Sequence, residues 1–363
     1  MADVVILGAG QAGLGTAYWL RRSAPQLSVL LLDRSARVGQ VWLDRWDSLR
    51  LFTPRRFSSL PGLPFPAGDE ACPDRVEMAD YLADYAGHFG FDVRLGSPVE
   101  RVRRVGTAFE VTVGGQRLSA KHVVVATGPF HDPAVPDAAA RLAPEVRQLH
   151  SYDYRRPADL PGWRVTVVGG GNSAAQLALE LAEVREVTLV TPEVPWFVPA
   201  RVLGLSSYRW MRALGVLDAA ADGPLGHYLR RRGDGVFGRE LRTAIRERRL
   251  RLLPSRVVGA DATALRLADG TRTPVTDVLW CTGFHSRYDW LEVPGALDDE
   301  GRPLHLDGAS PVEGLFWMGL PWQTRIASSI IYGVDGDARR VADRIVAASS
   351  AAVSSSGRRA PCR

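Results

Sequence analysis

Two glycine clusters are the residues of this sequence most able to bind a nucleotide. The first is GAGQAG, from Gly8 to Gly13, and the second is GGGNSA, from Gly169 to Ala174. Glycines at this spacing let the backbone approach a pyrophosphate, which then meets the free N–H groups at the start of the following helix. Alanine at the end of the second cluster fits a site where helix and strand pack closely. Both clusters therefore predict dinucleotide-binding turns.

Apolar runs around each cluster predict a strand–turn–helix–strand unit. The expected segments are Val4–Leu7, Gly15–Arg22 and Ser28–Leu32 in the first unit, and Arg164–Val168, Ser173–Ala182 and Val187–Val190 in the second. Asp33 follows the first unit at the distance expected of a carboxylate that binds ribose hydroxyls. Thr191 takes that place in the second unit, where the lack of an acid leaves room for a 2′-phosphate.

Two dinucleotide units in one chain indicate a flavoprotein that passes a hydride from NAD(P)H to FAD. Two further apolar runs each end in a Thr-Gly turn, at Thr127–Gly128 and at Thr282–Gly283, and each closes one unit. Alternating runs between Gly96 and Ala120, and a shorter set from Ser255 to Trp280, predict β-meanders packed on the units. The predicted fold is α/β, with two nested Rossmann-like dinucleotide-binding domains, for FAD and NAD(P)H, and β-meander insertions.

The same features predict the domain limits. The FAD-binding domain is expected at residues 1–155 and 284–348, and the NAD(P)H-binding domain is expected as an insertion at 156–283. The remaining residues, 349–363, are dominated by Ala, Ser and Arg. This low complexity predicts a disordered tail.

Composition favours a globular protein that acts on small molecules. Hydrophobic residues make up 46% and charged residues 23%, no apolar run has the length of a membrane span, and the N-terminus lacks a signal peptide, so a cytoplasmic location is expected.

The basic charge of the sequence comes almost wholly from arginine, because Lys121 is the only lysine, and the formal net charge is +5. The dense arginine run from Leu229 to Leu253 is interpreted as a solvated helix face with apolar positions at Val236, Leu241 and Ile245. The alternative is attraction of an anionic cofactor or substrate. Because the arginines are scattered and no apolar run could span a membrane, we expect no nucleic-acid partner and no membrane contact.

Cysteine spacing bears on the chemistry. Cys72, Cys281 and Cys362 are isolated, and no C-x-x-C pair exists. This pattern argues against a redox-active dithiol and against a zinc site, and no metal is expected. Cys281 lies in an apolar run, which favours a packing role.

The stretch WDSLRLFTPRRFSSLPGLPFP, from Trp46 to Pro66, strongly resembles the segment after the FAD strand in class B flavin-dependent monooxygenases. This family holds the flavin-containing, plant YUCCA-type and Baeyer–Villiger monooxygenases, with many short bacterial relatives. Further motifs similar to those of the family follow in the expected order: RVGQVW (Arg37–Trp42), HSYDY (His150–Tyr154), CTGF (Cys281–Phe284) and GLFWMGLPW (Gly314–Trp322). The resemblance covers about residues 3–346.

The resemblance implies an FAD-dependent monooxygenase that uses NADPH, with NADH as an alternative, and O2. In this family NADPH reduces FAD, oxygen adds at flavin C4a to give a (hydro)peroxyflavin, and bound NADP⁺ shields this species until a small organic molecule takes the distal oxygen. The protein supplies positioning and exclusion of water. N-, S- and Baeyer–Villiger oxygenation all stay open, as does the oligomeric state, with a homodimer as one option.

Motifs and resemblance together predict the site residues. The expected catalytic residues are Phe52, Thr53 and His150, although His150 can equally be an ordinary hydrogen-bonded loop histidine. Asp335 or Asp337 is expected to cap the last helix, whose N-terminus would face the flavin or its phosphates. The expected cofactor-binding residues are Gly8, Gly10, Gln11, Ala12, Gly13, Asp33, Arg34, Gln40, Val41, Trp42, Thr53, Thr127, Gly128, Gly169, Gly171, Asn172, Ser173, Ala174, Thr191, Gly283 and Asp335.

Some positions depart from the family pattern. Pro144 and Val146 stand where the family signature has Phe and Gly, and Phe52 aligns with an asparagine of the animal enzymes. Many relatives have an arginine at the place of Thr191 that binds the NADPH phosphate, and Arg201 is a candidate substitute. These departures keep a second function open: an NAD(P)H-dependent flavin oxidoreductase or oxidase that does not oxygenate a substrate.

Overall fold

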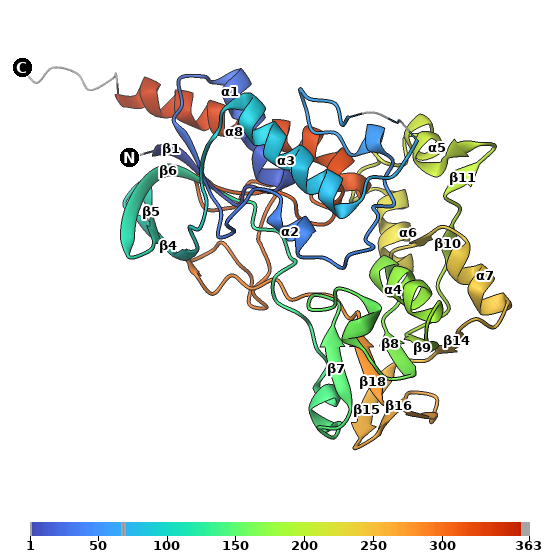
Figure 1. Ribbon diagram of the computed structural model, residues 1–363. Helices are drawn as coiled ribbons and strands as arrows, with labels where there is room; N and C mark the ends of the chain where they lie inside the picture. Colours follow the sequence, from blue (N-terminus) through green and yellow to red (C-terminus); the bar gives the residue numbers. More distant parts are fainter. Residues whose placement is uncertain (1, 67, 69, 357–363) are drawn as a thin grey trace, which may run out of the picture.

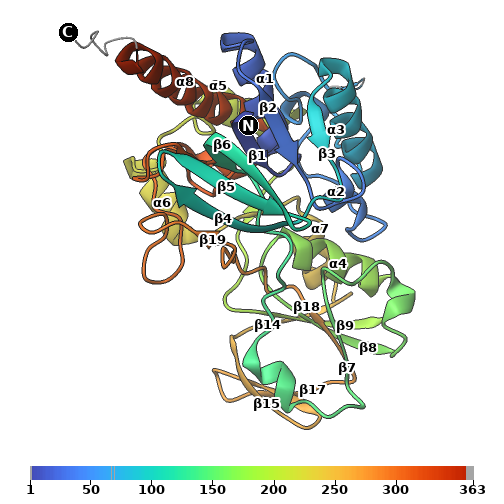
Figure 2. The ribbon, with the colours of Figure 1, turned by 90° about the vertical axis from the view of Figure 1, so that its left-hand side faces the viewer.

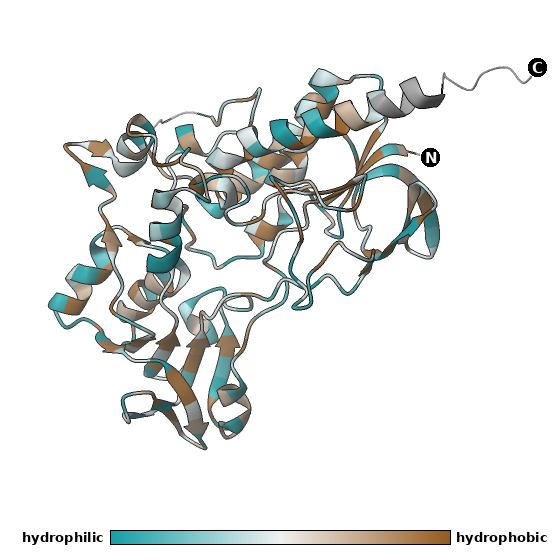
Figure 3. Ribbon diagram, turned by 180° about the vertical axis from the view of Figure 1, so that it is seen from behind, coloured by the Kyte–Doolittle hydropathy of each residue, from teal (hydrophilic) through white to brown (hydrophobic). Residues whose placement is uncertain are grey.

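The structure is a computed structural model that describes residues 2–66, 68 and 70–356, with no side chains described from 351 on. Its two largest sheets, one mixed and one entirely parallel, each lie at the centre of their own domain (Figure 1). The side chains of the central strands are buried on both faces, and many strand ribbons are brown, the colour of hydrophobic residues, in Figure 3. Sheets buried on both faces are the expected setting for parallel strands.

The first sheet is assembled from both ends of the chain. Its parallel part has the order β20-β6-β1-β2-β3, formed by Leu315–Trp317, Gln116–Val125, Ala2–Leu7, Val29–Leu32 and Asp92–Arg94. The long strand β6 continues into an antiparallel meander with β5 (Ala108–Val113) and β4 (Val99–Val105), and β19 (Leu291–Glu292) extends it. The meander predicted between Gly96 and Ala120 is thus confirmed.

Three helices cover one face of this sheet: α1 (Gln11–Ser23), α3 (Arg75–Phe89) and α8 (Ile331–Ser356). Val4 and Ile6 point to these helices, whereas Val5 and Leu7 face the meander. In Figure 1, α8 lies along α1. The two helices approach closely because Gly15 has no side chain, and a Cβ there would lie 2.5 Å from Cγ1 of Val334.

The second sheet is entirely parallel, with the order β14-β9-β8-β18-β7. Its strands are Arg251–Pro254, Glu186–Thr191, Arg164–Val168, Asp277–Trp280 and Arg147–His150. Helices α4 (Asn172–Ala182) and α7 (Glu240–Arg246) cover one face. The small meander β15–β17 (Val257–Asp261, Ala264–Leu267 and Arg272–Pro274) covers the other, at the bottom of Figure 2.

An irregular insertion links β9 to α7 and reaches the first domain. It holds two short strand pairs and two helices: β10 (Phe197–Val198) with β13 (Val236–Phe237), β11 (Arg201–Val202) with β12 (Leu205–Ser206), α5 (Ser207–Ala213) and α6 (Pro224–Arg232). Tyr208 and Leu217 of this insertion pack on Phe57 and Ala327 of the first domain. The remaining short helices are α2 (Gln40–Leu43) and the 3-10 turns Arg55–Phe57, Asp137–Arg141, Pro157–Asp159 and Ile326–Ser329.

Three expectations need correction. Strand β7 pairs with β18, so the second sheet begins before the predicted domain boundary at residue 156. The predicted tail is helical as far as Ser356, because its alanines continue α8, whereas 357–363 lie outside the described residues. The arginine run does not form one helix face: α6 ends at Arg232, Gly233 caps it, and Val236 belongs to β13.

Among residues 2–66, 68 and 70–356, no helix combines the length and apolar character needed to cross a membrane. The same residues contain no group of three or more His, Cys, Asp or Glu side chains placed to hold a metal ion.

Candidate functional site

The first glycine cluster forms the turn between β1 and α1. Gly8 has a φ of +109°, and a Cβ there would lie 2.4 Å from the carbonyl oxygen of Ala126. A Cβ at Gly13 would lie 1.9 Å from the carbonyl oxygen of Gly8. At Gly10, by contrast, a Cβ would meet no described atom within 4 Å. The fold itself requires the outer two glycines, and the middle one borders open space at the N-terminus of α1.

Asp33 lies beside this turn, directly after β2. Its Oδ2 accepts a hydrogen bond from the N–H of Ala9 at 2.8 Å, and its Oδ1 accepts one from the N–H of Ser35 at 2.8 Å. These bonds orient the carboxylate and leave lone pairs for ribose hydroxyls. The first-turn N–H groups of α1, on Gln11, Ala12 and Gly13, have no partner within the helix by geometry. The turn, the helix start and Asp33 therefore fit the ADP part of FAD. Arg34, next to Asp33, is exposed.

The second glycine cluster repeats this geometry between β8 and α4. Gly169 has a φ of +148°, and a Cβ there would lie 2.3 Å from the carbonyl oxygen of Cys281. At Gly171 a Cβ would meet no described atom within 4 Å. Ala174 is buried where the first unit has Gly13, and Ser173 lies in the first turn of α4. This turn fits a second dinucleotide.

Thr191 is the structural counterpart of Asp33. Gly8 N–H donates to the carbonyl of Leu32, and Gly169 N–H donates to that of Val190, so the next residue is equivalent in the two units. The Thr191 side chain is only 1% exposed, and its hydroxyl donates to the carbonyl of Glu193 at 2.6 Å. The end of β9 therefore offers neither a carboxylate nor a cation to a ribose.

Asn172 also differs from its counterpart Gln11. Its side-chain amide donates to the carbonyl of Gly235 at 3.1 Å, and its Oδ1 accepts from the N–H of Phe237 at 2.9 Å. Asn172 thus holds the segment after α6 against the N-terminus of α4. The sequence predicted a direct cofactor contact for Asn172, and the structure shows this positioning role.

The two Thr-Gly turns occupy equivalent places at the ends of the central strands. Ala126 N–H donates to Leu7, and Cys281 N–H donates to Val168, each at the end of β1 or β8. Gly128 has a φ of +66° and Gly283 a φ of +84°, a left-handed conformation that favours glycine. Figure 2 shows the chain passing between the two domains in this region.

A buried arginine that the sequence did not single out lies at this crossing. The guanidinium of Arg45 lies over the rings of Trp46, Phe130 and Phe284, at 5.4, 5.1 and 5.4 Å from their centroids. Arg45 is 9% exposed, and burial lowers its pKa. Within the described residues no carboxylate lies within 4.0 Å of it, and its Nη1 has no hydrogen-bond partner. Cation–π contacts therefore hold this charge between the two domain connections.

Arg45 belongs to the segment that the sequence places beside the flavin. Gln40 and Val41 begin α2, and the Gln40 amide donates to Asp44. The indole N–H of Trp42 is buried without a partner among the described residues. An unpaired buried donor costs free energy, so this group is suited to donate to a bound cofactor.

Phe52 and Thr53 lie at the contact between the two domains. The ring of Phe52 stacks on Phe237 at 4.8 Å with an angle of 4° between the planes, and Phe237 stacks on Tyr208 at 5.3 Å. Thr53 is buried and lies within hydrogen-bonding reach of Tyr208. Phe237 also follows the segment held by Asn172, so the predicted catalytic pair lies near the second glycine turn.

His150 lies elsewhere on this contact, at the end of β7. It is 4% exposed, its Nδ1 accepts from the N–H of Tyr152 at 3.1 Å, and its ring meets Phe284 edge-on at 5.1 Å. Burial lowers the pKa of His150, which favours the neutral imidazole. No direct contact joins it to Phe52 or Thr53 in the part of the chain described.

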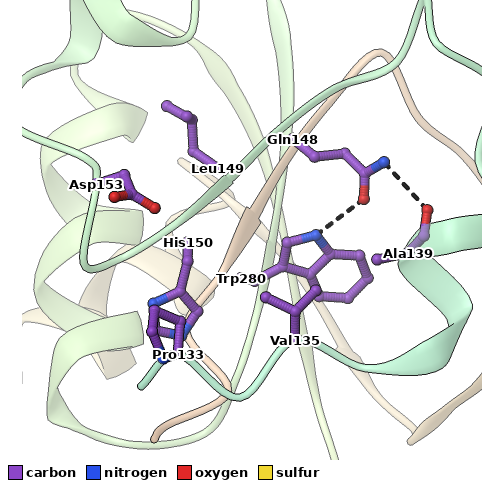
Figure 4. Close-up of a pocket in the computed structure, with 8 residues that line it drawn as sticks. All are labelled: Pro133, Val135, Ala139, Gln148, Leu149, His150, Asp153 and Trp280. Atoms are coloured by element: carbon purple, nitrogen blue, oxygen red, sulfur yellow. Dashed lines mark hydrogen bonds between the residues drawn. The ribbon is translucent and has the colours of Figure 1, made fainter. Parts of the chain in front are cut away.

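A shallow pocket of about 380 Å³ opens beside His150 (Figure 4). Its wall includes Trp280, whose indole N–H donates to Gln148 Oε1 at 3.1 Å. Gln148 in turn donates to the carbonyl of Ala139 at 3.1 Å. These polar groups are paired with one another, so they stabilise the edge of the second sheet.

The prediction that Asp335 or Asp337 caps the last helix is wrong. Helix α8 begins at Ile331, so both residues lie inside it. The Asp335 carboxylate accepts a hydrogen bond from the indole of Trp19 at 2.9 Å and joins α8 to α1. Asp337 is fully buried and bonded to Thr324. Asp335 thus links the two helices, and its contact with the cofactor stays a prediction.

The comparisons agree with this geometry. Residues 5–206 match the family described as pyridine nucleotide-disulphide oxidoreductase. The oxidoreductase CzcO-like of Geobacillus kaustophilus is 38% identical over 346 residues, which cover 95% of this chain and 99% of that protein. The indole-3-pyruvate monooxygenase YUCCA1 of rice is 32% identical over 220 residues, 58% of this chain and 52% of the plant protein.

A solved structure extends the likeness to the whole fold. The flavin-containing monooxygenase of Stenotrophomonas maltophilia superposes with a TM-score of 0.79 at 31% identity, over 95% of this chain and 98% of that one. The chain thus combines two equivalent dinucleotide turns with the fold and sequence of these flavoproteins. It belongs to the class B flavin-dependent monooxygenase family and is an NAD(P)H-dependent flavoprotein oxidoreductase.

Proposed function

We propose that this protein oxygenates a small organic molecule with O2, using FAD in its first unit and NAD(P)H in its second. The observation that carries the proposal is the repeated turn: Gly10 and Gly171 each leave open the N-terminus of a helix in the same chain. Each of these helix starts is suited to an anionic pyrophosphate. When bound, FAD supplies hydride acceptance and activation of O2.

The chain's own residues would hold and shield these groups. The turn at Gly8–Gly13 and Asp33 would bind the ADP part of FAD, and the turn at Gly169–Ala174 would bind the coenzyme. Phe52 forms a stack of aromatic rings with Phe237 and Tyr208, and Thr53 lies within hydrogen-bonding reach of Tyr208. Both residues would exclude water from the reacting atoms. His150, neutral and packed on Phe284, would keep the domain connection in place.

The alternative function is that of an NAD(P)H oxidase, which reduces O2 without transferring oxygen to a substrate. Phe52 favours it, because an apolar ring stacked on Phe237 offers no hydrogen-bond donor to activated oxygen. A monooxygenase transfers one atom of O2 to the substrate, whereas an oxidase of this kind releases both atoms as hydrogen peroxide.

Labelled oxygen distinguishes them. The FAD-loaded protein would be supplied with NADPH, ¹⁸O2 and one compound each from the thioether, amine and ketone classes. We expect one class to gain a single ¹⁸O atom and to lower the hydrogen peroxide released per NADPH consumed. Release of all consumed O2 as hydrogen peroxide with every class would contradict oxygenation and support the oxidase. Absorbance of the flavin during a single oxidation of the reduced protein would test the route through flavin C4a.

A further inference from the structure

The arginine-rich end of α6 lies beside the second nucleotide turn. Helix α6 ends in Arg230, Arg231 and Arg232, and Gly233 follows. The sequence left open whether these arginines form a solvated surface or attract an anion. The structure distinguishes the three side chains by their contacts.

Arg232 has the most ordered guanidinium of the three. It lies 4.7 Å from the ring centroid of Trp196 and 5.9 Å from that of Tyr228, and its Nη1 donates to the Tyr228 hydroxyl at 2.6 Å. Within the described residues, no carboxylate lies within 4.0 Å of it. Stacking on two rings restricts the side chain without neutralising it, so the remaining donors are free for an anion.

The other two arginines are less suited. Arg230 stacks on Trp322 at 5.1 Å and donates to the carbonyl of Ala221 at 3.3 Å, which directs it toward the first domain. Arg231 is exposed and has no ring or hydrogen-bond contact among the described residues. Arg201, the substitute considered from the sequence, is exposed in a hairpin.

Hydrogen bonds and close packing connect Arg232 to the coenzyme turn. The Trp196 indole donates to the carbonyl of Gly233 at 3.2 Å, and a Cβ on Gly235 would lie 2.8 Å from the Trp196 ring. Gly235 in turn accepts from Asn172, the first residue of α4. The end of α6, Trp196 and the helix start that faces the coenzyme therefore form one packed unit.

The position matches the end of the coenzyme that carries the extra phosphate. In such units a dinucleotide lies across the carboxyl ends of the strands, with a ribose beside the residue that follows the second strand. That residue is Thr191, which supplies no charge, and Trp196 follows it by five positions. Trp196, on which the Arg232 guanidinium lies, is thus close in sequence to the strand end where this ribose would lie.

We propose that Arg232 binds the 2′-phosphate of NADPH and that α6, rather than the end of β9, selects the coenzyme. The inference rests on the proposed function only in that the second unit holds the nicotinamide dinucleotide. A forked cation paired with a phosphate forms charge-assisted hydrogen bonds that a hydroxyl cannot. Arg232 would act through binding alone, because a 2′-phosphate takes no part in hydride transfer.

Binding of nucleotide fragments tests the proposal without turnover. Calorimetry on the FAD-loaded protein would compare 2′,5′-ADP with 5′-AMP, which differ only in the 2′-phosphate. Arg232→Gln should weaken 2′,5′-ADP by about tenfold to a hundredfold and leave 5′-AMP unchanged. Arg232→Lys should lose less affinity for 2′,5′-ADP, because lysine keeps the positive charge but lacks the paired N–H donors of a guanidinium. Arg231→Gln is the matched control, with a loss below about twofold, because long-range attraction alone is screened.

The rate of anaerobic flavin reduction gives a second readout. Arg232→Gln should lower the kcat/KM ratio of NADPH to NADH through KM, with kcat retained. If Arg232→Gln changes neither 2′,5′-ADP binding nor this ratio by more than about twofold, far below the expected effect, the inference is overturned while the coenzyme site stands. If wild-type protein binds neither fragment, the assignment of the second unit is overturned as well. Oxygen transfer to a substrate enters neither measurement.

Discussion

The two nucleotide units of this protein share a backbone and differ in their side chains. In each unit the first glycine of the turn has a positive φ and packs against a carbonyl just after the adjoining strand. The middle glycine borders open space, and a Thr-Gly turn follows the adjoining strand. After the second strand, however, the first unit has Asp33, bonded to two N–H groups, and the second has buried Thr191. The backbone of both units thus suits a dinucleotide, and we expect side chains to determine which one: Asp33 in the first unit and, by our proposal, Arg232 in the second.

The largest effects should come from filling the open middle positions. Gly10→Val should yield folded protein that has lost most of its roughly one FAD per chain, because the new side chain meets no protein atom but occupies the pyrophosphate space. Gly171→Val should keep FAD and lose reduction by NAD(P)H. Flavin absorbance and anaerobic reduction rates would measure both. Full flavin content in Gly10→Val would exclude the first assignment.

Gly8→Ala is the structural control for this pair. Its Cβ would collide with the Ala126 carbonyl, and its positive φ alone disfavours other residues by about 1–3 kcal/mol. We therefore expect a lower midpoint of thermal unfolding in Gly8→Ala and little change in Gly10→Val. Equal destabilisation of the two variants would show that the middle glycine is also needed for folding.

An intermediate effect should follow from making the second unit resemble the first. Thr191→Asp places a carboxylate at the position of Asp33, where it would accept ribose hydroxyls and repel a phosphate. The kcat/KM ratio of NADPH to NADH should fall by about tenfold or more. Thr191→Arg should raise it by less, since Arg232 would already supply a cation. Ratios within about twofold of wild type in both variants, well below this estimate, would place residue 191 away from the ribose.

A smaller effect, on the pH dependence of the free energy of unfolding, is expected at the strands that flank each unit. Trp317 ends β20 next to β6, and His150 ends β7 next to β18. Burial lowers the pKa of His150 in the folded protein. As the pH falls, the His150 side chain therefore binds a proton in the unfolded chain before it does so in the folded protein. The free energy of unfolding should therefore fall as the pH drops below about 6.5.

Urea unfolding between pH 5 and 8 would measure this dependence. His150→Phe should make the curve shallower, by at most about 1.4 kcal/mol per pH unit, the contribution of one proton. An unchanged slope in the variant would mean that His150 binds protons equally in the folded and unfolded states.

No effect on flavin reduction is expected at the residues before the Thr-Gly turns, Ala126 and Cys281. Burial raises the pKa of the Cys281 thiol to about 12, so it is protonated and unreactive at neutral pH. Cys281→Ala should reduce flavin with NAD(P)H at the wild-type rate, and Cys72→Ser should do the same. A large loss of rate in either would reveal a redox role for a thiol.

The sequence predicted the parts of this comparison that depend on local pattern. Both glycine turns, the strands around them and Asp33 could be found because strand, turn, helix and acid follow at fixed spacing. The contacts of Asn172 and Arg232 could not be predicted from the sequence, because they join segments of an irregular insertion of short strands and helices to distant residues. Arg45 has no sequence signal that separates it from the other arginines, since its aromatic neighbours come from two distant connections. Asp335 was misplaced because α8 begins earlier than its acidic residues suggested.

The return of the chain to its first sheet has a consequence for synthesis. Strands β1 and β2 are translated before the second sheet, but β20 and α8, which complete the first sheet and cover α1, are translated after it. At about 5–20 residues per second, on the order of half a minute separates the two events. During that interval the apolar surface that receives α8, including the Gly15 face of α1, lacks its cover. The first domain can therefore bury this surface only after the second sheet has been synthesised.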